Sequence, residues 1–336
     1  MRALRLLVPL VLLFAATAEA GAPVTVQPIS FRVNVPGELF ITRTVRGNLY
    51  LPATDSMCTR SVVLLLHGLS YGAWAWDFPL QTQTYSMARA LASSGYPAVT
   101  IDELGYGSSD HPNGYNLTVE NYGEVTSQIV SKLRGGSYSA TTPLRFSKVI
   151  LFGHSAGTEM AELAAGLHGN VDGLIAGAYS HAPSAGILLS VITQDTPNAL
   201  LHPYIYFAGN ASARAADMFD LPNADPAIVD RDTQLANLTP SGEILTIGNQ
   251  PSRAAVPLIT APVLLVMAQH DALFPPDLAG VDLASTELAL FLGSSDRSKY
   301  IVPASGHTFM LHPNAPETQK VVTDWLSARY PRCAVP

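Results

Sequence analysis

The feature that most constrains the fold of this sequence is an alternation of short apolar runs with longer segments of helical length. Residues 62–66 (VVLLL) and 263–266 (VLLV) are apolar throughout, as expected of parallel strands covered on both faces. With 48% apolar and 13% charged residues, the chain has the composition of a protein with a buried core, which excludes a disordered chain, a collagen and a coiled coil. The alternation predicts an α/β fold with an open, mostly parallel central sheet and helices on both faces. The expected strands are 31–35, 39–42, 48–51, 61–66, 98–101, 148–152, 174–178, 263–267 and 300–302, and the expected helices are 85–94, 119–133, 159–167 and 318–328.

The regular alternation stops between residues 183 and 257. This stretch mixes apolar and polar segments rich in Ala, Asn, Asp and Pro, and the strand pattern resumes at 263. We therefore predict a core formed by residues 21–182 and 258–336, with 183–257 inserted as a cap or lid. In sheets of this kind ligands bind beyond the carboxyl ends of the strands, where such a cap is expected to lie.

The first twenty residues have the pattern of a secretory signal peptide. Arg2 and Arg5 precede an apolar stretch at 6–16, and Ala18-Glu19-Ala20 forms a cleavage site with small residues. A membrane anchor is the alternative, but the apolar run is shorter than the ~20 residues that a spanning helix needs. We expect a secreted, extracellular protein without a stable membrane anchor after cleavage.

The rest of the chain carries features that agree with secretion. Its two cysteines, Cys58 and Cys333, form an even pair and predict one disulfide in an oxidising compartment. Asn116, Asn210 and Asn237 each begin an Asn-x-Ser/Thr acceptor for N-glycosylation. The formal net charge of −7, without a long basic run, disfavours a nucleic-acid partner.

The motif that carries chemistry follows the apolar run 149–152 and reads Gly153-His154-Ser155-Ala156-Gly157. A serine on a sharp turn from strand to helix needs small residues two positions away on either side, and both are glycine here. A second G-x-S-x-G motif, centred on Ser70, also follows an apolar strand. The aromatic and proline-containing residues 73–79 after it are poor helix formers, so the pattern favours Ser155 as the nucleophile.

An acid and a histidine then follow in the order that such a nucleophile requires. Asp271 comes just after the apolar run 263–268, and His307 follows the predicted strand 300–302. Both positions belong to loops at the carboxyl ends of strands, where a serine on the turn would also lie.

On these motifs, together with Leu66-His67-Gly68 and the loop 102–109, the chain resembles the α/β-hydrolase superfamily, in its secreted serine-nucleophile branch with a cap insertion. The resemblance implies acyl transfer through a covalent ester on Ser155, with His307 as proton carrier and Asp271 orienting it. It also implies an oxyanion hole formed by the backbone N–H groups of Leu69 and Ala156. No cofactor is implied.

Other side chains near these motifs have open roles. His67, Trp74, Trp76, His154 and Glu103 are candidates for the substrate pocket, although positions in the core or in a turn suit them as well. No metal site is expected, because His181, His270 and His312 lack a ligand spacing such as H-E-x-x-H.

The function expected is that of a secreted, cofactor-independent serine hydrolase that cleaves small carboxylic esters or lactones. One alternative is a cap-bearing serine aminopeptidase similar to proline iminopeptidases, whose acidic cluster would come from Glu103, Asp110, Asp217 or Asp220. Another is a binding protein or a biosynthetic cyclase that reuses the fold. The sequence leaves the acyl preference and the oligomeric state open.

Overall fold

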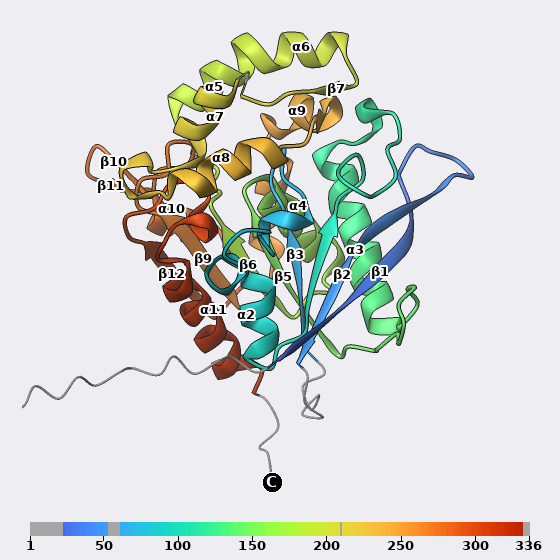
Figure 1. Cartoon of the computed structure of the whole chain (residues 1–336). Helices are drawn as coiled ribbons and strands as arrows, with labels where there is room; N and C mark the ends of the chain where they lie inside the picture. Colours follow the sequence, from blue (N-terminus) through green and yellow to red (C-terminus); the bar gives the residue numbers. More distant parts are fainter. Residues whose placement is uncertain (1–22, 53–60, 209, 332–336) are drawn as a thin grey trace, which may run out of the picture.

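A computed structural model of the protein describes residues 23–52, 61–208 and 210–331, and shows a central sheet of eight strands (Figure 1). The strand order is β1-β2-β4-β3-β5-β6-β9-β12, in which β2 runs antiparallel to both of its neighbours, β1 and β4, and all the pairs from β4 to β12 are parallel. The expected α/β architecture is therefore present. The strands are β1 (Val24–Asn34), β2 (Thr42–Pro52), β3 (Ser61–Leu66), β4 (Ala98–Asp102), β5 (Lys148–His154), β6 (Gly173–Gly177), β9 (Val263–Ala268) and β12 (Arg297–Val302).

The predicted strands match the sheet except near its antiparallel edge. The prediction of a strand at 39–42 is wrong, because Leu39 and Phe40 are exposed in a turn and Phe40 has a φ of 62°. β1 and β2 instead run for 11 residues each and pair along their whole length. Near its end β1 alternates buried Phe31 and Val33 with exposed Arg32, the period of an edge strand covered on one face. The predicted signal peptide, Cys58 and Cys333 lie outside the described residues.

Helices cover both faces of the sheet (Figure 1). α3 (Val119–Gly135) and α4 (Ala156–His168) pack so closely on one face that a Cβ on Gly123 would lie 2.6 Å from the Leu163 Cβ. α2 (Met87–Ser93) and α11 (Ala315–Arg329) contact each other on the other face. No helix in the described ranges combines the length and the apolar character that crossing a membrane would require.

Residues 183–257, called the helical segment below, connect β6 to β9 and lie at the carboxyl end of the sheet, at the top of Figure 1. The helical segment consists mainly of α5 (Ala185–Ser190), η3 (Val191–Asp195), α6 (Thr196–Leu201), α7 (Ala211–Met218), α8 (Pro226–Leu235) and α9 (Ser241–Ile247), with the short strands β7 (Tyr204–Ile205) and β8 (Thr239–Pro240) and single turns at η4 (Leu221–Asn223), η5 (Pro251–Ala254) and η6 (Val256–Leu258). The remaining short elements are η1 (Ala73–Ala75), α1 (Thr82–Tyr85), η2 (Gly114–Asn116), β10 (Asp277–Leu278), β11 (Val281–Asp282), α10 (Leu283–Ala289) and η7 (Phe309–Leu311).

A buried hydrogen bond ties the helical segment to the loop after β4. The Tyr106 hydroxyl donates to Glu243 Oε2 at 2.6 Å, and the Glu243 side chain is fully buried. This burial raises the pKa of Glu243 to about 8, because the charged carboxylate is poorly solvated there. Glu243 is therefore neutral at mildly acidic pH.

The raised pKa of Glu243 predicts how stability depends on pH. The native state binds one proton more than the unfolded state between the usual pKa of 4.5 and about 8, so the free energy of unfolding falls as the pH rises through this window. Glu243→Gln keeps a neutral side chain at every pH. We expect the free energy of unfolding of this variant to rise by ~4 kcal/mol relative to that of the wild type between pH 5 and pH 8.5 in urea titrations, because most of the titration window lies in this range. Exposed Glu317→Gln is the control, and an equal pH dependence in wild type and Glu243→Gln would exclude Glu243 as the titrating group.

Candidate active site

Ser155 stands on a sharp turn between β5 and α4. Its φ of 55° and ψ of −125° are unusual for a residue with a side chain. The turn is held by the Ser155 N–H, which donates to the Gly177 carbonyl of β6 at 2.8 Å. The side chain is thereby placed at the carboxyl end of the sheet, with 8% of the residue exposed.

The neighbouring glycines are required by this turn. A Cβ on Gly153 would lie 2.4 Å from the Gly157 carbonyl oxygen, and one on Gly157 would lie 2.5 Å from the His67 carbonyl oxygen. Gly68 approaches from β3 so closely that its Cβ would lie 2.8 Å from the Ser155 Cβ. The loop after β3 therefore passes directly beside Ser155.

The second G-x-S-x-G motif has a different environment. Ser70 is 1% exposed, and its hydroxyl donates to the Leu69 carbonyl and accepts a hydrogen bond from Arg214 Nη1, both at 2.5 Å. Its side chain thus has internal partners, whereas that of Ser155 borders a cavity. This difference agrees with the preference for Ser155.

His307 and Asp271 meet in the loops after β12 and β9. His307 Nδ1 lies 2.9 Å from Asp271 Oδ2 and 3.2 Å from Oδ1. The Asp271 carboxylate also accepts hydrogen bonds from the backbone N–H groups of Leu273 and Phe274 at 2.8 and 2.9 Å. These contacts fix the carboxylate, and through it they orient the imidazole.

Two further histidines support the loop that carries His307. His154 Nε2 donates to the His307 carbonyl at 3.0 Å, and burial holds the pKa of His154 well below its usual range. His312 Nε2 accepts from the N–H groups of Gly306 and Asp220, both at 3.1 Å. Burial lowers the pKa of His312 as well, and both imidazoles serve as neutral hydrogen-bonding supports. Their ring contacts depend on tertiary structure, so no local sequence pattern predicts these roles.

The loop after β3 carries one of the two predicted oxyanion donors, the Leu69 N–H, and the other, the Ala156 N–H, lies at the start of α4. His67 Nδ1 donates to the Gly68 carbonyl at 2.9 Å, while Nε2 accepts from the Glu103 N–H at 3.2 Å. Burial lowers the pKa of His67 to about 4, so the ring is neutral and makes no ion pair with Glu103. Because a peptide unit is planar, holding the Gly68 carbonyl also fixes the direction of the Leu69 N–H. Within the described residues, the N–H groups of Leu69 and Ala156 have no hydrogen-bond acceptor.

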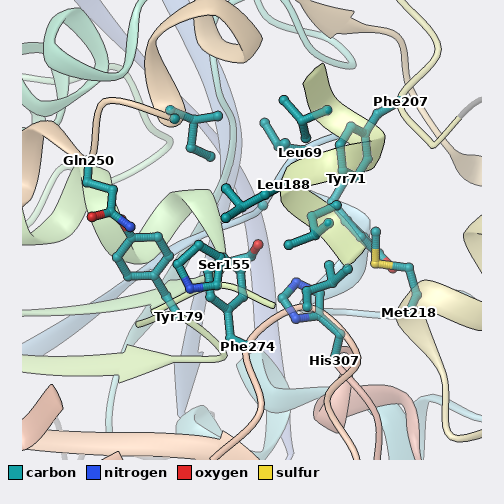
Figure 2. Close-up of a pocket in the computed structure, with 17 residues that line it drawn as sticks. Leu69, Tyr71, Ser155, Tyr179, Leu188, Phe207, Met218, Gln250, Phe274 and His307 are labelled. Atoms are coloured by element: carbon teal, nitrogen blue, oxygen red, sulfur yellow. The ribbon is translucent and has the colours of Figure 1, made fainter. Parts of the chain in front are cut away.

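Ser155 and His307 border the same cavity, as Figure 2 shows. No hydrogen bond joins their side chains in the part of the chain that the structure describes. Apart from Ser155, His307 and Gln250, the wall is formed by apolar and aromatic residues and by glycine, and it includes no carboxylate among the described residues. They are Gly68, Leu69, Tyr71, Tyr179, Pro183, Ile187, Leu188, Val191, Phe207, Met218, Ile247, Gly248, Leu273 and Phe274.

None of the five candidates for the substrate pocket belongs to this wall. His67 and His154 support backbone groups behind it, and Trp76 is fully buried 4.8 Å from the Phe152 ring centroid. Trp74 packs against Tyr71, whose ring lies between Trp74 and the helical segment. Glu103 is buried, and burial together with the nearby Glu243 carboxyl raises its pKa well above the usual range. About half of the wall comes from the helical segment instead, and no local sequence pattern indicates which residues of this segment line the cavity.

The acids considered for an aminopeptidase do not converge on the cavity. Asp110 pairs with Arg46 at 2.9 Å, and Asp220 lies 2.5 Å from His270. Asp217 is half-buried on α7. No group of three His, Cys, Asp or Glu side chains suited to a metal ion occurs among the residues that the structure describes.

Comparisons with known proteins agree with this architecture. The profile described as "Alpha/beta hydrolase family" matches residues 63–316. No curated protein matches the chain. Among solved structures, a thermophilic esterase from Thermogutta terrifontis, solved with malate bound, aligns with a TM-score of 0.67 and 16% identity, covering 90% of this chain and 99% of the esterase.

Two other solved structures have the same fold. A monoacylglycerol lipase from Paleococcus ferrophilus gives a TM-score of 0.58 at 19% identity, over 80% of this chain and 94% of the lipase. A hydrolase from Pseudomonas aeruginosa PA01 gives 0.60 at 15% identity, over 89% and 97%. At these identities the structures establish the fold alone, whereas the profile spans most of the sequence. The chain therefore belongs to the α/β hydrolase family.

Proposed function

We propose that the protein is a serine hydrolase that cleaves carboxylic esters or lactones with an apolar acyl group through an acyl-enzyme on Ser155. One observation carries this proposal: a serine on a strained turn and a histidine bonded to an aspartate border one apolar cavity. The esterase and lipase among the structural neighbours agree with an ester substrate.

In the proposed reaction, the Ser155 hydroxyl attacks the substrate carbonyl and His307 Nε2 takes its proton. Asp271 keeps the proton on Nδ1 and stabilises the imidazolium that forms. The N–H groups of Leu69 and Ala156 receive the negative oxygen of the tetrahedral intermediate. His307 then protonates the leaving alcohol, and water releases the acid by the reverse sequence. The described residues show no hydrogen bond between Ser155 and His307, and we propose that this bond forms when substrate binds.

The cavity also favours an ester over a peptide substrate. A free amino terminus needs a carboxylate partner, and the described wall contains none. This removes the main support for the aminopeptidase alternative. We further propose that the helical segment acts as a cap, since Ile187, Leu188 and Val191 from α5 and η3 close the cavity above the sheet.

We propose that the protein is secreted after cleavage of residues 1–20. Asn116 and Asn210 are exposed, which agrees with glycosylation, although the Asn116 amide donates to Glu38 Oε1 at 3.1 Å; the half-buried Asn237 amide donates to the Tyr71 carbonyl at 2.9 Å. A Cys58–Cys333 disulfide is supported by neighbouring described residues. The Tyr96 hydroxyl, just before β4, donates to the Tyr330 carbonyl at 3.1 Å, which places the end of α11 near the beginning of β4 and of its neighbour β3.

Substitution of the nucleophile tests the proposed chemistry. We expect Ser155→Ala to lose labelling by a fluorophosphonate and to lower kcat for a nitrophenyl ester by 10³-fold or more, as expected when a unit of this kind loses its nucleophile. His307→Ala should lower kcat comparably. Exposed Ser327→Ala is the matched control and should behave as wild type. Mass spectrometry should find the adduct on the peptide containing Ser155, and labelling that persists in Ser155→Ala would contradict the proposal.

The apolar wall predicts a preference for longer acyl chains. Each buried methylene contributes up to ~0.8 kcal/mol, so kcat/KM for nitrophenyl esters should rise up to about fourfold per added carbon until the cavity is full. Val191→Trp, which narrows the wall, should move the optimum to shorter chains. Its neighbour Ile192 is 65% exposed and does not border the cavity, so Ile192→Trp should leave the optimum unchanged. Equal kcat/KM for acetate and longer esters would argue against an acyl-binding role of this cavity.

A further inference from the structure

A buried arginine of the helical segment reaches the loop that carries the proposed oxyanion donor. Arg214 lies on α7 and is fully buried. Its Nε donates to Asp232 Oδ2 of α8 at 2.8 Å, and its Nη1 donates to the Ser70 hydroxyl. Its guanidinium carbon lies 4.6 Å from the centroid of the Tyr71 ring. One side chain therefore contacts the two residues that follow Leu69.

A second residue of the helical segment holds the same two residues through their backbone. The Asn237 N–H donates to the Ser70 carbonyl at 2.8 Å, and its side-chain amide donates to the Tyr71 carbonyl. Ser70 has a φ of 64°, a conformation that a residue with a side chain seldom adopts without external support. The Ser70 hydroxyl, which accepts a hydrogen bond from Arg214, itself donates one to the Leu69 carbonyl.

The buried ion pair of Arg214 and Asp232 is not explained by a contribution to stability alone. A buried ion pair often stabilises a protein no more than apolar residues of similar volume would, because both charges lose their hydration. Here Arg214 Nη2 and Asp232 Oδ1 have no hydrogen-bond partner among the described residues, so the pair is also incompletely satisfied. The contacts do, however, fix both peptide units that follow Leu69.

We propose that Arg214 and Asp232 are positioning residues for the oxyanion hole, holding Ser70 and Tyr71 so that the Leu69 N–H faces the carbonyl attacked by Ser155. His67 fixes the Gly68 carbonyl from the core side, and Arg214 fixes Ser70 from the helical segment. The donor is thus correctly oriented only when the helical segment is docked on the sheet. This inference rests on the proposed serine hydrolase function.

The test separates binding of the tetrahedral oxyanion from binding of the ground state. The probes are an alkyl trifluoromethyl ketone, which forms a hemiketal oxyanion with a serine nucleophile, and the corresponding trifluoromethyl alcohol, which fills the same cavity without reacting. We expect Ser70→Ala to lower kcat 10- to 100-fold, since loss of a whole donor costs about 10²- to 10³-fold. Its affinity for the ketone should fall by the same factor, while KM and the affinity for the alcohol change less than twofold.

Variants of the ion pair extend the test. Arg214→Lys keeps the charge but lacks the fork that reaches both Asp232 and Ser70. Arg214→Met combined with Asp232→Leu removes both charges and avoids an unpaired buried carboxylate. The Arg214→Lys variant and the Arg214→Met/Asp232→Leu double variant should each show the same selective loss of affinity for the ketone as Ser70→Ala. Arg231→Met, a neighbour on α8 whose guanidinium bonds Gln234, is the control and should match wild type.

The outcomes distinguish this inference from the proposed function. If wild type forms the hemiketal and the variants bind ketone as tightly as wild type, or lose ketone and alcohol affinity equally, the positioning role is wrong. If wild type forms no hemiketal while Ser155→Ala binds the ketone equally well, the proposed function itself fails.

Discussion

The site depends on the backbone of Ser155, which is held in a conformation that costs of the order of 1–3 kcal/mol. The sheet supplies the support. The Gly177 carbonyl accepts from the Ser155 N–H, and the Thr158 hydroxyl bridges the Gly177 N–H and carbonyl. Since β5 is paired on both sides over its length, the turn has no room to relax, and only glycine fits where β3 and α4 approach it. The same crowding brings Gly68, and with it the Leu69 N–H, next to the serine.

Burial gives the histidines around the site different roles. His67 and His154 are enclosed by apolar and aromatic side chains, which disfavour the charged imidazolium, and each uses its ring N–H to hold a backbone carbonyl. His307 differs because it has both a carboxylate partner and a face on the cavity. Of these three imidazoles, that of His307 alone borders the cavity that Ser155 also borders, and its neighbours define where it lies.

The sequence predicted most of the sheet, the turn at Ser155 and the loops of Asp271 and His307, because these depend on local patterns of apolar residues and glycine. The predictions from the sequence were incomplete or wrong where tertiary packing determines the position of a residue. Leu39 and Phe40 look like a strand but lie exposed in a turn, and of the two roles that the sequence left open for Trp76, pocket or core, the structure shows the core. Part of the cavity wall comes from α5, η3, α7 and α9, whose positions no local pattern specifies. The buried charge of Arg214 on α7 was not predicted from the sequence.

The short helix α7 and the residues just after it touch both halves of the site. Arg214 reaches the loop beside Leu69, while the Met218 carbonyl accepts from the N–H and hydroxyl of Thr308, next to His307. Asp220 adds the contact to His312. A movement of α7 would therefore displace the oxyanion donor and the imidazole together. α5 and η3 make different contacts: Leu188 borders the cavity yet is 42% exposed, and Leu189 and Ile192 beside it are more exposed still. Displacement of α5 and η3 would therefore expose apolar wall but leave the Arg214 and Thr308 contacts intact.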